Sequence, residues 1–312
     1  MTHLIDFMRS RWSIYNFLSR VYEKEITESL LKEMVTENTS MGLRRLFEEE
    51  YLNVAEAFND LKECLKALIG DVEKNVSKLA QEYAYLFLGL GGLPHPSESS
   101  YLNGDGLLMQ DLRDQVLSIY SSLGVEKNGD YRELEDHIAV ELQFMAYLCR
   151  RSIESFAKGE EHEGKRYLET QKDFLCNHLA VWVPKLAENV LEKARTDFYK
   201  IIACITEEFL KAEKNTLNKL TSLSGVCFNG SSFFEEFPRE TLIKPTSGTG
   251  GGKLEVKSYY KLLGLCGIAQ GGNLVRVDVE AGRIIRIVPV HYDEQYKPEE
   301  LESVRWRVDA RG

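Results

Sequence analysis

Apolar residues recur every three or four positions along most of the first 225 residues, which is the spacing of amphipathic helices. The stripes run from Leu4 to Tyr22, Val54 to Leu68, Val76 to Phe87, Leu107 to Leu123, Leu134 to Phe156, Tyr167 to Trp182 and Leu186 to Phe209. Several stripes end at a glycine, as helices commonly do, and a hinge is expected at Pro184. Short connections between such helices predict an all-α bundle.

The pattern changes after residue 245. Residues 247–252 read SGTGGG, which forms neither helix nor strand and behaves as a flexible tether. Beyond it, residues 274–288 alternate between apolar and polar positions, and residues 280–283 (EAGR) supply a turn. The chain is therefore expected to have a helical domain at 1–245, a linker at 246–252 and a C-terminal segment at 253–312 that contains a β-hairpin.

Composition narrows the class of protein. The chain has 312 residues, of which 43% are hydrophobic and 28% charged, enough for a substantial core. A formal charge of -10 argues against a nucleic-acid surface, which needs clustered Lys and Arg. Charges near the start and the lack of an 18-residue apolar run predict a cytoplasmic chain without a membrane span.

Two loops interrupt the helical pattern. Residues 89–101 contain three glycines and two prolines, so they form a shaped loop. Residues 128–137 lead into the longest stripe, where Asp130 is placed to cap the helix and Glu133, three residues later, to complete a capping box.

Enzyme and cofactor motifs fail at specific positions. The segment 247–254 resembles a phosphate-binding loop, but that motif needs Gly at 247 and Ser or Thr at 254. The histidines form neither HExxH nor a Cys/His zinc pattern, and no GxSxG elbow occurs. We therefore predict no catalytic residue, no metal ligand and no cofactor.

Four segments, in order, resemble the signature of the TorD/DmsD/NarJ chaperone family. They read EYAYLFLG followed by PHPSESSY (82–101), EDH followed by ELQFM (135–145), HLAVWVP (178–184) and ARTDFY (194–199). The family's proline near the glutamate of the second segment is absent here. The resemblance spans roughly residues 10 to 212.

The resemblance implies a cytoplasmic, all-helical chaperone. Such a chaperone binds the N-terminal region of a molybdopterin-containing oxidoreductase and holds it until the cofactor is inserted. The residues that the resemblance assigns to peptide binding are Tyr83, Leu86, Phe87, Pro96, Glu98, Ser99, Tyr101, Asp136, His137 and Glu141.

These residue types suit a helix-in-groove mode of binding. Aromatic rings such as Tyr83, Phe87 and Tyr101 offer surface to an apolar peptide. Carboxylates such as Glu98 and Asp136 meet its backbone donors or basic side chains. His137 is either a pH-sensitive contact or a satisfied polar histidine near a helix start.

The C-terminal segment resembles the start of a client of that family. Residues 271–289 are similar to the first β-hairpin of molybdopterin oxidoreductases, and 306–312 (WRVDARG) to the segment that follows it in the transhydroxylase-like branch. Cys266 is the one cysteine of the C-terminal segment, so this segment ligates no iron–sulfur cluster. The residues expected to form the bound client peptide are Val256, Tyr259, Tyr260, Leu262, Leu263, Leu265 and Ile268.

We therefore expect a maturation chaperone fused to its own ligand. Two alternatives remain: a helical interaction or regulatory module with a β-appendage, and a small subunit of a redox enzyme. A joint of about eight residues spans roughly 16 Å. Docking within one molecule and exchange of peptide or helices in a homodimer both remain open.

Overall fold

A computed structural model describes residues 2–36, 50–102, 111–222, 241–246, 257–263, 273–280 and 283–289. The chain divides into two units, Met1–Thr246 and Ser247–Gly312. We call them the helical unit and the tail unit. Of the described helices, none is long and apolar enough to cross a bilayer.

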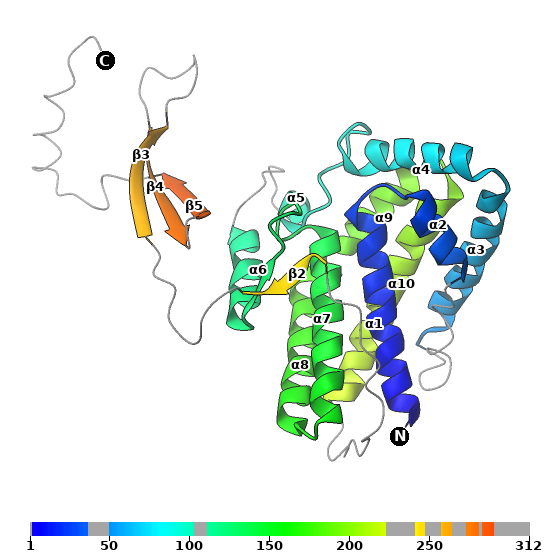
Figure 1. Cartoon of the computed structure of the whole chain (residues 1–312), viewed down its shortest axis with the longest axis horizontal. Helices are drawn as coiled ribbons and strands as arrows, with labels where there is room; N and C mark the ends of the chain where they lie inside the picture. Colours follow the sequence, from blue (N-terminus) through cyan, green and yellow to red (C-terminus); the bar gives the residue numbers. More distant parts are fainter. Residues whose placement is uncertain are drawn as a thin grey trace, which may run out of the picture. The chain divides into compact units, whose positions relative to one another are not determined.

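The helical unit confirms the predicted all-α bundle (Figure 1). Its helices are α1 (Thr2–Glu23), α2 (Glu28–Thr36), α3 (Leu52–Leu68), α4 (Val72–Phe87), α5 (Glu98–Leu102), α6 (Asp111–Ser122), α7 (Ile138–Ala157), α8 (Glu161–Phe174), α9 (Ala180–Lys193) and α10 (Asp197–Ser222). A 3-10 turn, Ile69–Asp71, precedes α4, and a π-helical turn, Leu175–Leu179, joins α8 to α9.

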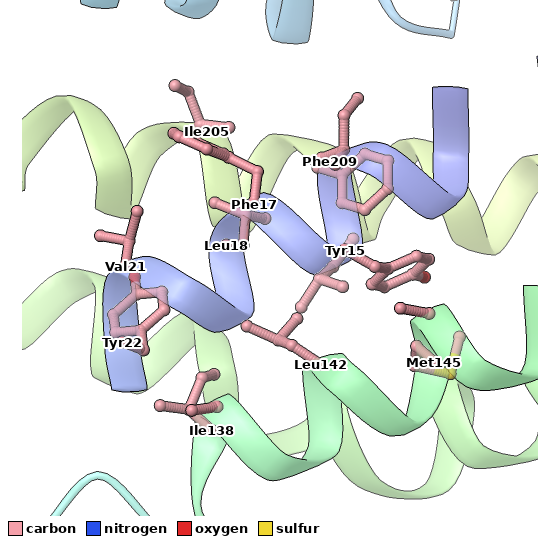
Figure 2. Close-up of a cluster of buried hydrophobic side chains, with 14 of the residues drawn as sticks. Tyr15, Phe17, Leu18, Val21, Tyr22, Ile138, Leu142, Met145, Ile205 and Phe209 are labelled. Atoms are coloured by element: carbon pink, nitrogen blue, oxygen red, sulfur yellow. The ribbon is translucent and has the colours of Figure 1, made fainter. Parts of the chain in front are cut away.

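The core lies where α1, α7 and α10 meet. Helix α1 packs along α7, and α10 packs against α9 and α3. Figure 2 shows side chains from the three helices gathered in one buried cluster. They include Tyr15, Phe17, Leu18, Val21 and Tyr22 from α1, Ile138, Leu142 and Met145 from α7, and Ile205 and Phe209 from α10. Helix α7 is buried on every side from Ile138 to Cys149, so it is the central helix of the bundle.

One polar cluster lies inside this apolar core. The Arg11 guanidinium and the Glu213 carboxylate are both fully buried, with Nη2 of the arginine 2.6 Å from Oε2 of the glutamate. The same Nη2 donates to Oε1 of Gln171 at 2.8 Å, and the Tyr51 hydroxyl donates to Glu213 at 2.5 Å. The cluster therefore joins α1, α8 and α10 to the residue before α3.

Residues 241–246 return to the helical bundle. Strand β2 (Ile243–Pro245) pairs antiparallel with β1 (Val125–Lys127). Oε1 of Gln143 on α7 accepts hydrogen bonds from the backbone N–H groups of Leu242 and Ile243, both of which are buried. The segment just before the glycine-rich residues is thus attached to the bundle.

We expect Gln143→Ala to release residues 241–246. The variant leaves two buried N–H groups without a partner, a loss of about 1–3 kcal/mol each. Amide hydrogen exchange at Leu242 and Ile243 should accelerate at least tenfold. Thr241→Val is the matched control, because it removes only the 3.5 Å contact to Nε2 of Gln143. Unchanged protection in Gln143→Ala would contradict this assignment.

Two local predictions about the helices are wrong. The long helix begins at Ile138 and not near Asp130, and its N-cap is His137. The reason is that the residues before it are held by backbone bonds to another loop. Pro184 causes no hinge, since α9 runs through it to Lys193. The chain turns instead at Arg195 and Thr196, whose N–H groups both donate to the Glu82 carboxylate.

The tail unit contains a three-stranded antiparallel sheet in the order β3-β4-β5. Strands β4 (Asn273–Glu280) and β5 (Arg283–Pro289) confirm the predicted hairpin, with a register irregularity at Asp278/Val279. Strand β3 (Lys257–Leu263) pairs with the other edge of β4, with Tyr259 opposite Val277.

The middle part of the expected client peptide forms a strand. Tyr259, Tyr260, Leu262 and Leu263 lie in β3, which pairs with β4, and a third strand makes the sheet more stable than a two-stranded hairpin. Binding of this peptide as a helix in a groove stays a prediction. Val256, Leu265, Ile268, the residues 247–252 and the segment 306–312 lie outside the described residues.

Candidate functional site

Two loops that are 40 residues apart in sequence lie side by side. The loop before α5 and the loop before α7 form an antiparallel bridge between Ser97 and His137. The Glu98 N–H donates to the Asp136 carbonyl, and the Ile138 N–H donates to the Pro96 carbonyl, both at 2.9 Å. We call this contact the loop junction. It brings together the first two resemblance segments.

Two side chains of the loop junction cap helices. The Asp136 carboxylate accepts from the Ser99 N–H at 2.9 Å, in the first turn of α5. Nδ1 of His137 accepts from the Ala139 N–H at 3.1 Å, at the start of α7. Burial is the main cause that lowers the pKa of His137 to about 3, with the nearby His95 contributing. Of the two readings of His137, the structure therefore favours the satisfied polar histidine.

Buried carboxyl groups lie beneath the loop junction. The Glu98 carboxylate lies 2.9 Å from Nδ1 of His178, and the Trp182 indole N–H donates to Glu141 at 3.1 Å. Glu98 and Glu141 are both completely buried. Burial, followed by the charges of Glu98 and Asp136, holds the pKa of the Glu141 carboxyl well above its usual range. The protonated form of this group is therefore favoured by folding.

The π-helical turn helps to place His178 at this cluster. A π turn adds one residue to a helical turn and is common at functional sites. The turn Leu175–Leu179 carries His178, whose ring stacks on Phe174 with centroids 4.8 Å apart. Trp182 follows one turn later and contacts Glu141. The third resemblance segment thus packs under the first two.

Three predicted peptide-binding residues lie in the core instead of on the surface. Tyr83 and Phe87 are only 4% and 3% exposed, and Leu86 is buried with them. The Tyr83 hydroxyl donates to the Tyr22 carbonyl at 3.0 Å, and the Phe87 ring contacts that of Tyr199. The expectation of an aromatic surface fails here, because an amphipathic pattern marks the side of α4 that is buried. In this conformation they support the fold around the loop junction.

Tyr101 is the one predicted aromatic residue that remains partly exposed. Its ring lies 5.4 Å from that of Trp182, and its hydroxyl accepts from Nδ2 of Asn189 at 3.4 Å. Helix α5 thereby packs against α9. Pro96, Glu98, Ser99, Asp136, His137 and Glu141 are all buried at or beneath the loop junction.

Large apolar side chains are exposed on the loop after α4 and on the helices α5 and α9, which pack against each other. Leu88 and Leu90 lie on the loop after α4, Leu102 ends α5, and Val181 lies at the start of α9. We call these four residues the rim. Val181 is 50% exposed although Trp182 beside it is fully buried. The apolar pattern did not predict the rim as an exposed surface. Leu88 and Leu90 lie beyond Phe87, the last residue of the apolar stripe of α4, and this position was the available signal that they are exposed.

The described residues contain one group of side chains suited to hold a metal ion. His95, Glu133 and His137 place one ligand atom each within 4.8 Å of one another. They come from the two loops of the loop junction. A search for ligand spacing along the chain misses such a group, because its members are brought together only by the fold.

Comparison with known proteins matches a different family to a part of each unit. Residues 48–188 match the model of the nitrate reductase delta subunit family, and residues 273–312 match that of the pyrogallol hydroxytransferase large subunit-like family, domain 1. The chaperone protein TorD of Vibrio parahaemolyticus is 30% identical over 216 residues, which cover 68% of this chain and 97% of that protein.

Two further relatives carry the same name. TorD of Vibrio cholerae is 28% identical over 217 residues, covering 67% of this chain and 93% of the relative. TorD of Aliivibrio fischeri is 27% identical over 220 residues, covering 68% and 97%. The similarity thus spans nearly the whole length of these relatives and leaves about a third of this chain unmatched.

Proposed function

The chain belongs to the TorD family of chaperones, and on that premise we propose that its helical unit binds the N-terminal segment of a molybdopterin-containing oxidoreductase. The helical unit holds this segment while the enzyme receives its cofactor, and it works in the cytoplasm. One observation supports the choice of client most strongly. Residues 273–312 of the same chain match the first domain of a hydroxytransferase large subunit.

The tail unit, on this proposal, is a piece of the client joined to its chaperone. We assign no reaction to either unit. The tail serves as the ligand, either within one molecule or by exchange between two copies of the chain.

We propose the rim as the contact surface for the client segment. Exposed Leu88, Leu90, Leu102 and Val181 offer apolar area, and Tyr101 adds a partly exposed ring with a polar tip. Apolar and aromatic anchors of this kind dominate peptide recognition.

The buried residues of the resemblance act beneath the rim. Glu98, Asp136 and Glu141 bind the loops and helices that carry the exposed side chains. Tyr83, Leu86 and Phe87 support α4, from which the loop with Leu88 and Leu90 departs. Their contribution to binding is therefore one of position.

A substitution at the rim tests this surface. We expect Val181→Asp to weaken binding of a fluorescent peptide of residues 253–280 at least tenfold, because it replaces an exposed apolar contact with a charge. A tenfold loss corresponds to about 1.4 kcal/mol. The peptide is titrated into the helical unit after the tail has been cleaved off at the linker and removed.

The matched control is Leu191→Asp. Leu191 is a second exposed apolar residue of α9, ten positions away and so about 15 Å along the helix. Equal losses in both variants would assign the effect to added charge, and an unchanged affinity in Val181→Asp would remove the rim from the proposal.

A further inference from the structure

We propose that His95, Glu133 and His137 form a binding site for a divalent first-row transition-metal ion of the zinc type. The three residues place their ligand atoms within 4.8 Å of one another. Two imidazoles and one carboxylate are a donor set that such ions take in proteins. The inference does not depend on the proposed chaperone function.

The positions of the three side chains suit capture of an ion from solution. Nε2 of His95 lies 2.9 Å from Oε2 of Glu133, a hydrogen-bond distance that needs to widen only to about 3.3 Å for both atoms to bind one tetrahedral ion. The side chains of these two residues are 29% and 35% exposed, so an ion can reach them. His137 is buried at the N-cap position of α7, and its ring centroid lies 5.5 Å from that of His95.

A hydrogen-bond relay prepares His137 as a ligand. The Tyr131 hydroxyl donates its single proton to the Glu23 carbonyl at 3.1 Å, so its oxygen is left as an acceptor 3.3 Å from Nδ1 of His137. When Nδ1 carries the proton and donates it to Tyr131, Nε2 has a free lone pair for the metal ion. Metal-binding histidines commonly have such a partner on the other ring nitrogen.

Metal binding on these terms exchanges one hydrogen bond for another. In the structure, Nδ1 of His137 also lies 3.1 Å from the Ala139 N–H, which requires the other tautomer. Metal binding favours the tautomer in which Nδ1–H of His137 donates to Tyr131. In that tautomer His137 no longer accepts the hydrogen bond from the Ala139 N–H. Lys127, held 2.5 Å from the Tyr131 carbonyl, adds a positive charge nearby. We therefore expect an affinity below that of a site whose ligands need no such exchange.

The site has a structural consequence for the loop junction. The three residues come from the loop before α5 and the loop before α7, which are already bridged at Ser97 and His137. An ion bound by both loops adds a second attachment at their outer edge. Three protein ligands leave at least one coordination position for water or another donor.

Titration of the full chain with Zn²⁺ and Co²⁺ tests this inference. After removal of any affinity tag and treatment with a chelator, calorimetry with Zn²⁺ should give one ion per chain. The Co²⁺ absorption spectrum should lack the intense charge-transfer band of thiolate ligands, which excludes the cysteines as the binding groups. His95→Ala and Glu133→Gln should each weaken Zn²⁺ binding at least tenfold.

Two controls keep the test decisive. His162→Ala removes an exposed histidine of α8 outside the site and should leave Zn²⁺ affinity unchanged. Circular dichroism should show that both site variants remain folded, as expected for substitutions of partly exposed side chains. Absence of binding, a thiolate band, or affinity that survives either His95→Ala or Glu133→Gln would overturn the proposal.

Discussion

We expect Glu213→Ala to lower the free energy of unfolding of the helical unit by about 3–5 kcal/mol. The substitution removes the carboxylate that faces the Arg11 guanidinium in the core, where both side chains are fully buried. It also removes the acceptor of the Tyr51 hydroxyl. An isolated buried charge costs far more than an unpaired surface charge, because no water replaces the lost partner. Urea unfolding followed by circular dichroism measures the change.

Two controls separate the buried pair from general effects of substitution. The double variant Arg11→Met, Glu213→Leu removes both charges and fills the space with apolar groups, so it should recover most of the loss. Glu188→Ala breaks an exposed ion pair with Lys185 on α9 and should change stability by less than about 0.5 kcal/mol. A loss below about 1 kcal/mol in Glu213→Ala would contradict the role given to this cluster.

We expect Glu141→Gln to make the protein increasingly more stable than the wild type as pH rises. The pKa of the Glu141 carboxyl is raised in the folded state by burial and by the charges of Glu98 and Asp136. Its contribution to stability is therefore fully present below the unfolded-state pKa of about 4.3 and is lost as pH rises toward the folded-state pKa. The glutamine cannot ionise, and its side-chain oxygen still accepts from the Trp182 indole.

The measurement is the difference in unfolding free energy between Glu141→Gln and the wild type from pH 4 to 8. This difference should grow by up to about 1.4 kcal/mol per pH unit above the unfolded-state pKa. Glu188→Gln, at an exposed ion pair of α9, is the matched control for the substitution itself. A flat difference for Glu141→Gln would mean that the carboxyl ionises in the folded protein as it does in water.

The bundle and the hairpin follow from apolar spacing, since helices and strands bury one face with a fixed period. The helical unit ends at Thr246, directly before the glycine-rich residues 247–252, a composition that favours neither helix nor strand. The predictions of a hinge at Pro184 and of a helix start near Asp130 are wrong, because each rests on a local preference that long-range contacts override. The Glu82 carboxylate accepts a hydrogen bond from the backbone of Arg195, where the chain turns. The backbone bonds of the loop junction hold the residues before α7, so this helix begins at Ile138.

The candidate site was only partly accessible from the sequence. The resemblance identified Glu98, Asp136 and Glu141, and the fold does bring them together. Their spacing in the sequence did not show whether these carboxyl groups are buried or lie on a binding surface. Their burial depends on His178 and Trp182, which are distant in sequence and pack against them in the fold. The same reason hid the Arg11–Glu213 pair and the group His95, Glu133 and His137.

Burial also changes how some variants are to be understood. Phe87→Ala removes a ring that contacts Tyr22 and Tyr199 in the core, so its main effect should be on stability. Asp136→Ala removes the acceptor for the Ser99 N–H and disturbs the loop junction. Reduced peptide binding in either variant therefore reports on folding first, and the rim residues are better suited to map the contact.

The most direct test of the central claim is whether the helical unit holds the tail unit once the covalent link is gone. Residues 248–252 are replaced by a protease site, and the folded chain is cleaved. The products are then separated by size exclusion over a dilution series that starts at about 10 µM. The proposal predicts that the two fragments co-elute and dissociate only on dilution, with one tail per helical unit in either a monomer or an exchanged dimer. Fragments that elute separately at every concentration would contradict the claim that this chaperone binds the client segment it carries.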